Sequence, residues 1–474
     1  MLPDAVVARL EDSDWRVRRE ALATLGKLDP ATLAQHAEAV VATLEDSVWN
    51  VRHWALTALG KLEPATLAQH AGAVVARLED TDWNVRCRAL TALAKLEPTT
   101  LAQHAGAVVA RLEDSDADVR KAALETLAKL EPATLVQYAG VVVATLEDSV
   151  WIVRYRALET LGKLEPATLA QHAEAVVARL EDTVLDVQYW AWETLAKLEP
   201  ATLAQYAGVV VARLEDSDGN VRYRALETLG KLDPATLAQH AEAVVARLED
   251  TDWLVRKRAL ETLAPLEPAT LARYASAVVA RLEDFLWNVR EAALETMGKL
   301  ELTTFAQYAD AVVPRLEDSH WRVHKMAVET LAKFEPATLV QYVGVVVARL
   351  EDPSCDVRKV ALETLAKLEP MTLAQQAGAV VARLEDSNSE VRAMACHTLE
   401  MLPRYVRYAT RGVDCEELFG RALDHGACEH LRSQLLGRIT WYRCRLRLRC
   451  WRGLALYWYA LPYRPSGPGH ARDL

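Results

Sequence analysis

Residues 64–97 read PATLAQHAGAVVARLEDTDWNVRCRALTALAKLE, and this stretch decides the fold because it recurs almost unchanged along the chain. The tripeptide Leu-Glu-Asp begins at residue 10 and returns every 34 residues up to residue 384, giving twelve copies without an insertion or deletion. A strict period of this length is typical of stacked repeats, in which each repeat contacts only its neighbours. Length alone suggests about three domains, but the period predicts one repeat array over residues 1–402.

Each repeat is predicted to contain two helices. In the second repeat the first helix covers residues 30–44, where apolar residues follow the 3,4-spacing of one helical face and Pro30 suits the first turn. The second helix covers residues 48–62. Ser or Thr follows Leu-Glu-Asp in ten of twelve repeats, as Ser47 does here, and is expected to cap the second helix. The fold class is therefore all-α, a right-handed α-solenoid of about twelve 34-residue helix pairs with a C-terminal helical cap or tail.

The second helix carries a family resemblance. Its pattern Asp-x-x-Val-Arg-x-x-Ala-Leu-x-x-Leu-(Gly/Ala)-x-Leu, at residues 82–96 of the third repeat, resembles the HEAT repeat, and more closely the short HEAT-like repeats of phycobilisome-lyase-type proteins. The resemblance implies that second helices line a concave surface. It also implies a ladder between successive repeats, made by an Asp of the turn and an Arg of the second helix. The implied ladder pairs are Asp46 with Arg52, Asp80 with Arg86 and Asp114 with Arg120, and Gln188 and His324 replace the Arg in two repeats.

One stripe of the second helix varies most between repeats and is predicted to face outward, opposite the buried arc. Bulky and charged side chains on such a solvent-facing stripe are candidates for binding a partner. The alternative is sequence drift at positions without a packing role. The candidate partner-binding residues on this stripe are Trp54, Arg88, Arg156, Trp190, Arg224, Arg258 and Met326.

Charge favours a protein partner over a nucleic acid. Residues 1–402 carry 42 basic and 60 acidic side chains, a net charge of about −18, whereas a nucleic-acid groove needs a continuous basic track. Glu recurs on the outward stripe in eight successive repeats, from Glu125 to Glu363, usually four residues before a Lys such as Lys129. We interpret these as i,i+4 pairs on a solvated face.

Aromatic residues recur at two further positions, and both are interpreted as structural. Trp begins the second helix in seven repeats, from Trp15 to Trp321, and is expected to pack between repeats and supply core volume. His or Tyr recurs in the first helix, from His36 to Tyr342. Stacked helices place equivalent atoms roughly 8–10 Å apart, too far for shared zinc ligands, so no metal site and no cofactor are predicted.

Several departures from the repeat cluster between residues 265 and 324. Pro265 is expected to truncate a second helix and Pro314 to kink a first helix. Phe285 replaces the expected cap and Leu302 the boundary proline. We therefore expect a bend or soft joint over residues 265–324.

The last 72 residues leave the register. Residues 403–462 hold Arg, Cys and aromatic side chains and are predicted to be a C-terminal cap on the array, and residues 463–474 a disordered tail. Three alternatives remain for this segment: a membrane-surface anchor, an RNA-binding element, or a zinc site from His425, Cys428, His430 and Cys444.

No catalytic motif accompanies the repeats: the chain has no Gly-rich phosphate loop, no GxSxG and no HExxH. We expect a non-catalytic protein-interaction scaffold with protein partners. The alternatives are a bilin-lyase-like protein, a regulatory subunit of an enzyme complex, or a membrane-surface adaptor acting through the C-terminal segment. The N-terminus lacks a signal-peptide pattern, no long apolar run occurs and seven Cys is an odd number, so a cytoplasmic location is expected.

Overall fold

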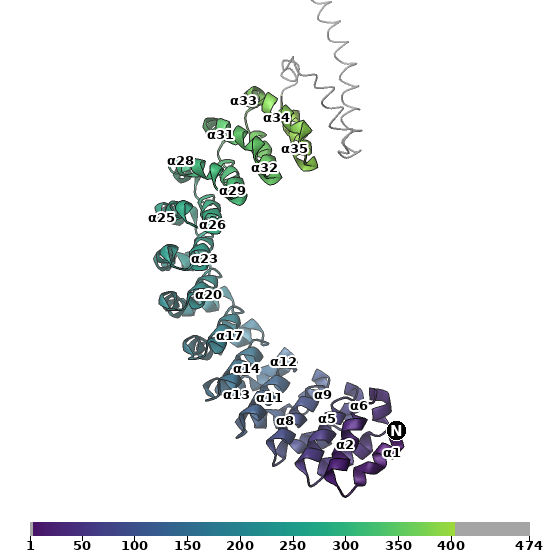
Figure 1. The fold of residues 1–474 in the computed structure, drawn as a ribbon. Helices are drawn as coiled ribbons and strands as arrows, with labels where there is room; N and C mark the ends of the chain where they lie inside the picture. The colour runs from purple at the N-terminus through teal and green to yellow at the C-terminus, as the bar shows by residue number, and fades with distance from the viewer. Residues whose placement is uncertain (1–2, 403–474) are drawn as a thin grey trace, which may run out of the picture. The chain divides into compact units, whose positions relative to one another are not determined.

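The computed structural model describes residues 3–402, and every regular element among them is helical. These residues form two compact blocks, a first block ending at Glu267 and a second block beginning at Pro268. We describe each block by itself. Within both, the 34-residue repeats stack side by side as predicted, so the described part of the chain is an all-α solenoid of HEAT type (Figure 1).

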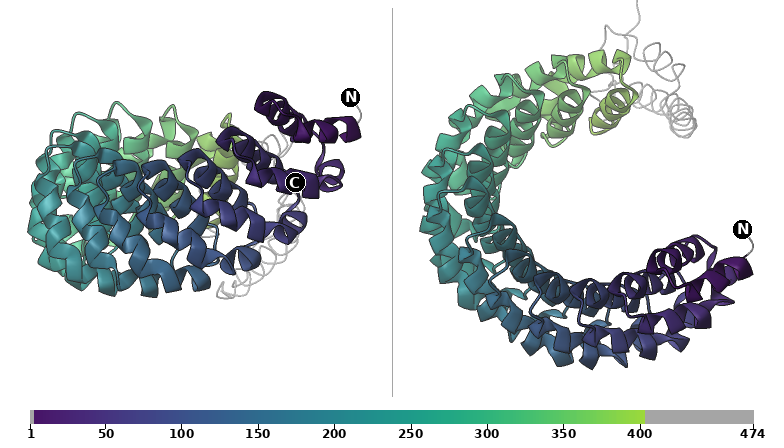
Figure 2. Two further views of the ribbon diagram at one scale, coloured as in Figure 1. Left: turned by 90° about the horizontal axis from the view of Figure 1, so that it is seen from below. Right: turned by 60° about the horizontal axis from the view of Figure 1, so that its bottom comes forward.

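Each described repeat contributes one long helix of 11 or 12 residues, the second helix of the sequence pattern. In each block the long helices lie on the inner side of the stack and the shorter helices on the outer side (Figure 2). The long helices of the first block are α2 (Trp15–Leu25), α5 (Trp49–Leu59), α8 (Trp83–Leu93), α11 (Ala117–Leu127), α14 (Trp151–Leu161), α17 (Leu185–Leu195), α20 (Gly219–Leu229) and α23 (Trp253–Leu263). Those of the second block are α26 (Trp287–Met297), α29 (Trp321–Leu331), α32 (Cys355–Leu365) and α35 (Ser389–Glu400).

The first helix of each repeat is not the single helix that the sequence predicts. In the second repeat it consists of α3 (Pro30–Ala34), α4 (Ala37–Ala42) and a 3-10 turn, Thr43–Glu45. The break falls at His36, whose backbone (φ −114°, ψ 9°) is not helical. The recurring His or Tyr therefore marks a kink, and the kink still keeps Leu33, Ala37 and Val40 buried.

The same pattern holds in the other repeats. The remaining α-helical pieces are α1 (Pro3–Val7), α6 (Pro64–Gln69), α7 (Ala71–Ala76), α9 (Pro98–Ala102), α10 (Ala105–Val109), α12 (Pro132–Leu135), α13 (Ala139–Ala144), α15 (Pro166–Ala170), α16 (Ala173–Ala178), α18 (Pro200–Leu203), α19 (Ala207–Ala212), α21 (Pro234–Gln239) and α22 (Ala241–Ala246) in the first block, and α24 (Pro268–Ala272), α25 (Ala275–Ala280), α27 (Leu302–Ala306), α28 (Ala309–Val312), α30 (Pro336–Leu339), α31 (Val343–Ala348), α33 (Pro370–Gln375) and α34 (Ala377–Ala382) in the second. The 3-10 turns cover Ala8–Glu11, Arg77–Glu79, Ala110–Glu113, Val136–Tyr138, Thr145–Glu147, Arg179–Glu181, Ala204–Tyr206, Arg213–Glu215, Arg247–Glu249, Arg281–Glu283, Val313–Glu317, Val340–Tyr342, Arg349–Glu351 and Arg383–Glu385.

Leu, Val and Ala fill most of the core, and the Trp that recurs at the start of the long helices does not. Leu56, Leu59 and Val51 of α5 are at most 1% exposed, and the equivalent residues repeat this along both blocks. By contrast, the Trp side chains that begin α5, α8, α14 and α29 are 39–41% exposed. The recurring Trp therefore lies at the edge of the core, and the prediction that it supplies core volume is wrong.

The expected Ser/Thr cap is also wrong by one residue. The cap of α8 is Asp82, whose carboxylate accepts the N–H of Asn84 at 2.9 Å, and Thr81 precedes it. The helix starts later than predicted because the side chain of Asp80, the Asp of Leu-Glu-Asp, first accepts the N–H of Asp82 at 3.0 Å. This turn places Asp82, the residue after Thr81, in the cap position.

The departures near residues 265–324 disturb the helices less than predicted. Pro265 does not truncate α23, which has the same 11 residues as its neighbours. Leu302 begins α27 at the usual boundary. Pro314 lies in the 3-10 turn Val313–Glu317, which has five residues where other described repeats have three or four, and Phe285 is 93% exposed. The joint over residues 265–324 stays a prediction, because these residues span the end of one block and the start of the other.

Candidate functional site

An arginine–aspartate ladder joins successive long helices to the next turn. Arg86 of α8 donates from Nε and Nη2 to the two carboxylate oxygens of Asp114 at 2.8 and 2.7 Å, and from Nη1 to the main-chain oxygen of Asp80 at 2.8 Å. Arg86 and Asp80, which the HEAT resemblance pairs, are thus in contact, but only through the main-chain oxygen of Asp80. The carboxylate that Arg86 binds is that of Asp114, in the next repeat. Arg52 likewise binds the carboxylate of Asp80, and Asp46 is bound by Arg18.

The ladder holds its carboxylates ionised. Burial alone would raise the pKa of Asp114, but hydrogen bonds from Arg86 and the N–H of Asp116, together with the Arg86 charge, outweigh burial and lower the pKa. The same balance lowers the pKa of Asp46, Asp80, Asp148, Asp182, Asp250, Asp318 and Asp386. Each side chain therefore contributes a fixed negative charge between two repeats.

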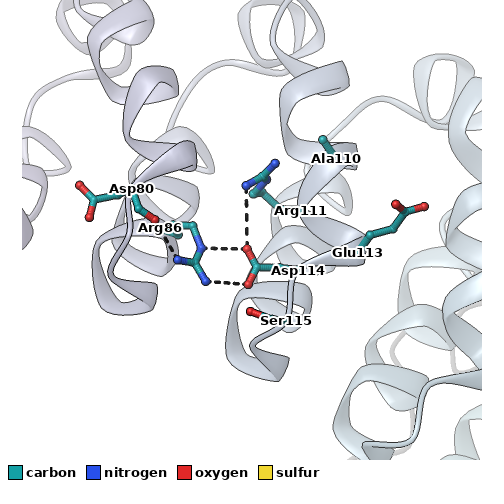
Figure 3. A pocket seen from close by; sticks show the side chains of 7 residues that line it. All are labelled: Asp80, Arg86, Ala110, Arg111, Glu113, Asp114 and Ser115. Carbon is teal, nitrogen blue, oxygen red and sulfur yellow. Dashed lines mark hydrogen bonds and ion pairs between the residues drawn. The ribbon is translucent and has the colours of Figure 1, made fainter.

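The hollow shown in Figure 3 lies between two repeats and is lined by this ladder. Its residues are Asp80, Arg86, Ala110, Arg111, Glu113, Asp114 and Ser115. Arg111 of the same repeat approaches Asp114 to 3.9 Å, while Arg86 of the preceding repeat binds Asp114 directly. Because the charged side chains that line the hollow pair with one another, they connect the two repeats.

A second arginine ladder was not foreseen. Arg111 donates from Nη1 to the main-chain oxygen of Leu78 at 3.0 Å and pairs with Glu79 at 2.8 Å, both in the preceding repeat. Arg77, Arg179, Arg315 and Arg383 make the equivalent contacts. The sequence signal for this ladder is the nearly invariant Ala-Arg-Leu-Glu-Asp, in which the same Arg recurs in most repeats. Thr43 and Thr145 replace this Arg twice, and each bonds within its own repeat instead.

The recurring Glu and Lys do not form the predicted i,i+4 pairs. Lys231 donates to the main-chain oxygen of Ala196 in the preceding repeat at 3.0 Å, and Lys197 makes the same contact with Gly162. Five of the eight Glu side chains pair instead with arginines of the candidate stripe: Glu125, Glu159, Glu193, Glu227 and Glu261. The face is neutralised as expected, but by other partners.

These arginines lie between repeats rather than free in solvent. Arg156 of α14 pairs with Glu125 of α11 at 3.0 Å and with Glu159 of its own helix at 2.6 Å. Arg224 of α20 repeats this with Glu193 at 3.1 Å and Glu227 at 2.7 Å. All candidate partner-binding side chains are half-buried, so the predicted solvent-facing stripe is only partly exposed.

Aromatic rings join the arginines into one surface on four successive helices. The Tyr155 and Trp190 rings meet edge to face with centroids 5.6 Å apart, linking α14 to α17. Arg224 lies 4.8 Å from the ring centroid of Tyr189, linking α17 to α20. Arg258 of α23 lies 4.8 Å from the ring of Tyr223. We call this surface the inner stripe and define it as Tyr155, Arg156, Tyr189, Trp190, Tyr223, Arg224 and Arg258.

The other predicted residues lie apart from the inner stripe. Trp54 is on α5, where its ring meets His53 edge to face, and Arg88 is on α8. Met326 is on α29 of the second block. The tyrosines were missed because they lie one position before the stripe that the helical wheel selected. Tyr189 is 45% exposed, and Leu185 at the start of the same helix is 61% exposed.

Within residues 3–402 no group of three or more His, Cys, Asp or Glu side chains is arranged to hold a metal ion. In the same range no helix is both long and apolar enough to cross a bilayer. The predicted cap, tail and zinc residues fall within residues 403–474, outside the described residues.

Comparison with known families places the chain. The model of the adaptin N-terminal region matches residues 36–296, more than half of the sequence. The chain belongs to this adaptin family. The match agrees with the HEAT-type repeats inferred from the sequence. None of the curated protein sequences compared with this adaptin-family chain matches it.

Solved structures similar to this adaptin-family chain include importin beta, Kap95p and the karyopherin Kap121p. A crystal structure of importin beta has a TM-score of 0.63 at 14% identity, covering 84% of this chain and 66% of importin beta. Kap95p, solved with RanGDP, has a TM-score of 0.54 at 14% identity, covering 88% and 64%. Kap121p has a TM-score of 0.58 at 14% identity, covering 91% and 52%. The chain thus spans less than two thirds of each neighbour, and the likeness is one of fold.

Proposed function

We propose that this protein is a non-catalytic scaffold that binds a protein partner along the inner side of its long helices. The observation that carries the proposal is the inner stripe, where aromatic and arginine side chains from four successive helices form one continuous, half-exposed surface. Aromatic and arginine side chains are the residue types that dominate binding energy at protein interfaces. The stripe also lies on four regular long helices, α14, α17, α20 and α23.

The structural neighbours support a protein partner. Kap95p is described in complex with RanGDP, and Kap121p in complexes with Nup53p and with the extreme C-terminus of the phosphatase Cdc14p. In each case a stacked helical array binds another protein. By analogy of fold we propose a protein, and not a nucleic acid, as the partner of this chain.

The test compares two matched triple variants by quantitative affinity purification and mass spectrometry. Trp54→Ala, Trp190→Ala and Met326→Ala together remove bulky side chains from the long helices. Val136→Ala, Val209→Ala and Val340→Ala remove apolar side chains, 39–43% exposed, from the 3-10 turns Val136–Tyr138 and Val340–Tyr342 and from α19, all in first helices of their repeats. We expect the first variant to lose its partners by about tenfold or more and the control to keep them. Equal retention by both variants, with unchanged circular dichroism, would contradict the proposal.

The finer alternatives from the sequence remain proposals. These are a bilin-lyase-like role, a regulatory subunit of an enzyme complex, and a membrane-surface adaptor using residues 403–462. Flotation with anionic liposomes, comparing the full chain with one ending at Pro403, tests the adaptor. A cytoplasmic location is likewise a proposal, checked by fractionation of cells.

A further inference from the structure

Among the junctions within the first block, the one between α17 and α20 differs from the rest. The two helices meet far less extensively than any other consecutive pair of long helices in that block. Three kinds of inter-repeat hydrogen bond that recur at other junctions are missing here among the described residues. The differences trace to two residues of α17, Gln188 and Trp192.

Gln188 replaces the Arg of the first ladder, so the Arg–Asp carboxylate pair, or rung, that joins two repeats elsewhere is missing here among the described residues. Its amide donates to the main-chain oxygen of Asp182 at 2.6 Å, as the Arg of other repeats does, but it is too short to reach the next turn. The carboxylate that would receive the rung, Asp216, is 24% exposed, whereas Asp80, Asp114 and Asp250 are each 4% exposed. The ladder is therefore open at this one junction of the first block.

Trp192 occupies a core position that is Leu in the neighbouring repeats, Leu158 and Leu226. It is 3% exposed, and its indole N–H has no hydrogen-bond partner among the described residues. Two further bonds are lost next to it. Thr228 does not reach the main-chain oxygen of Trp192, although Thr262 reaches that of Leu226 at 3.1 Å. Arg213 pairs with Glu181 at 3.1 Å but makes no hydrogen bond to Leu180 within the described residues.

Apart from the exposed Arg213–Glu181 pair, the polar contacts that remain at this junction join α17 and α20 or the residues just after them. Arg224 still pairs with Glu193 and still lies over the Tyr189 ring, and Lys231 still donates to Ala196. A junction that keeps its contacts on one side and lacks hydrogen bonds on the other is expected to rotate about the side that keeps them. Of the residues that make these contacts, Tyr189 and Arg224 belong to the inner stripe.

We propose that the α17–α20 junction is a hinge built into the first block, closing and opening about the Arg224–Tyr189–Glu193 contacts. Opening separates the turn of Asp216 from α17 and changes the spacing of the inner stripe across the junction. The hinge follows from the packing of this chain and does not depend on the identity of a partner. It would let the array adjust the curvature of its inner side at one defined place.

Native-state hydrogen exchange of the full chain tests the hinge. Residues 213–222 contain the open junction, and residues 111–120 are their counterparts at an intact one. Local opening lowers protection without global unfolding, so we expect protection factors about tenfold lower over residues 213–222. Equal protection of the two segments would overturn the proposal.

Two variants assign the effect to its cause. Gln188→Arg restores the rung and Trp192→Leu restores the regular core residue, and together they should raise protection at residues 213–222 to that at residues 111–120. Arg120→Gln is the matched control, since it opens an intact rung and should lower protection around Asp148. If Trp192→Leu impairs folding, Gln188→Arg alone must raise protection. Protection unchanged in both restoring variants would contradict the assignment.

Discussion

At the scale of single residues, the aspartate of Leu-Glu-Asp accepts hydrogen bonds both from its own turn and from the preceding repeat. In the third repeat, one oxygen of Asp80 accepts the N–H of Asp82, which shapes the turn before α8. The same carboxylate receives two hydrogen bonds from Arg52 of the preceding repeat. One side chain therefore fixes a helix start and fastens two repeats together.

Substituting Asp80 or its neighbour Glu79 distinguishes the stability that the ladder contributes from that of an exposed ion pair. Asp80→Asn leaves Arg52, whose side chain is 11% exposed, without its counter-charge. We expect a loss of about 3 kcal/mol of unfolding free energy, measured by urea denaturation. Glu79→Gln is the control, because Glu79 is 73% exposed and its pair with Arg111 is worth at most about 1 kcal/mol. Equal losses for the two variants would contradict the ladder's role.

The ladder also predicts sensitivity to acid. The folded pKa of ladder aspartates such as Asp80 and Asp114 is lowered from 3.8, so as pH falls these groups take up protons first in the unfolded chain. Stability from these groups is fully present above the unfolded pKa and is lost as pH falls from about 4 through the folded values. We expect Tm to change little between neutral pH and about pH 5 and to fall steeply below about pH 4. A Tm that is flat down to pH 3 would exclude this linkage.

At the scale of elements, periodicity predicted the long helices better than the short ones. The buried positions of α5, such as Val51, Leu56 and Leu59, follow from 3,4-spacing alone. The kink at His36 could not be predicted in this way, because residues 33, 37 and 40 keep the apolar spacing through it. The cap was misplaced because Ser and Asp are both good caps and stand next to one another.

The cap assignment can be checked in the third repeat. Asp82→Ala removes the carboxylate that accepts the N–H of Asn84 and should cost about 1 kcal/mol. Thr81→Ala removes the hydroxyl of the residue before the cap and should change stability by less than about 0.5 kcal/mol. Urea denaturation measures both variants. A larger cost for the threonine would restore the cap predicted from the sequence.

At the scale of the whole molecule, the period of 34 residues made the repeat array predictable, while the surface was only partly so. Helical geometry selected Arg156, Trp190, Arg224 and Arg258, which the structure joins on successive helices. It missed Tyr189 and Tyr223, because each lies one position before the stripe that the helical wheel selected. The hinge could not be predicted for a different reason. Gln188 was recognised as a weak rung, but the effect of Trp192 lies in packing between repeats.

If the inner side of the long helices binds the protein partner, that partner must lie against α17. Site-specific photo-cross-linking measures this, with p-benzoylphenylalanine placed at Tyr189 of α17 or, as a matched exposed position in a short helix, at Val209 of α19. We expect a discrete protein to be cross-linked from Tyr189 and not from Val209. Cross-linking of the same protein from Val209 alone, or equally from both positions, would contradict it.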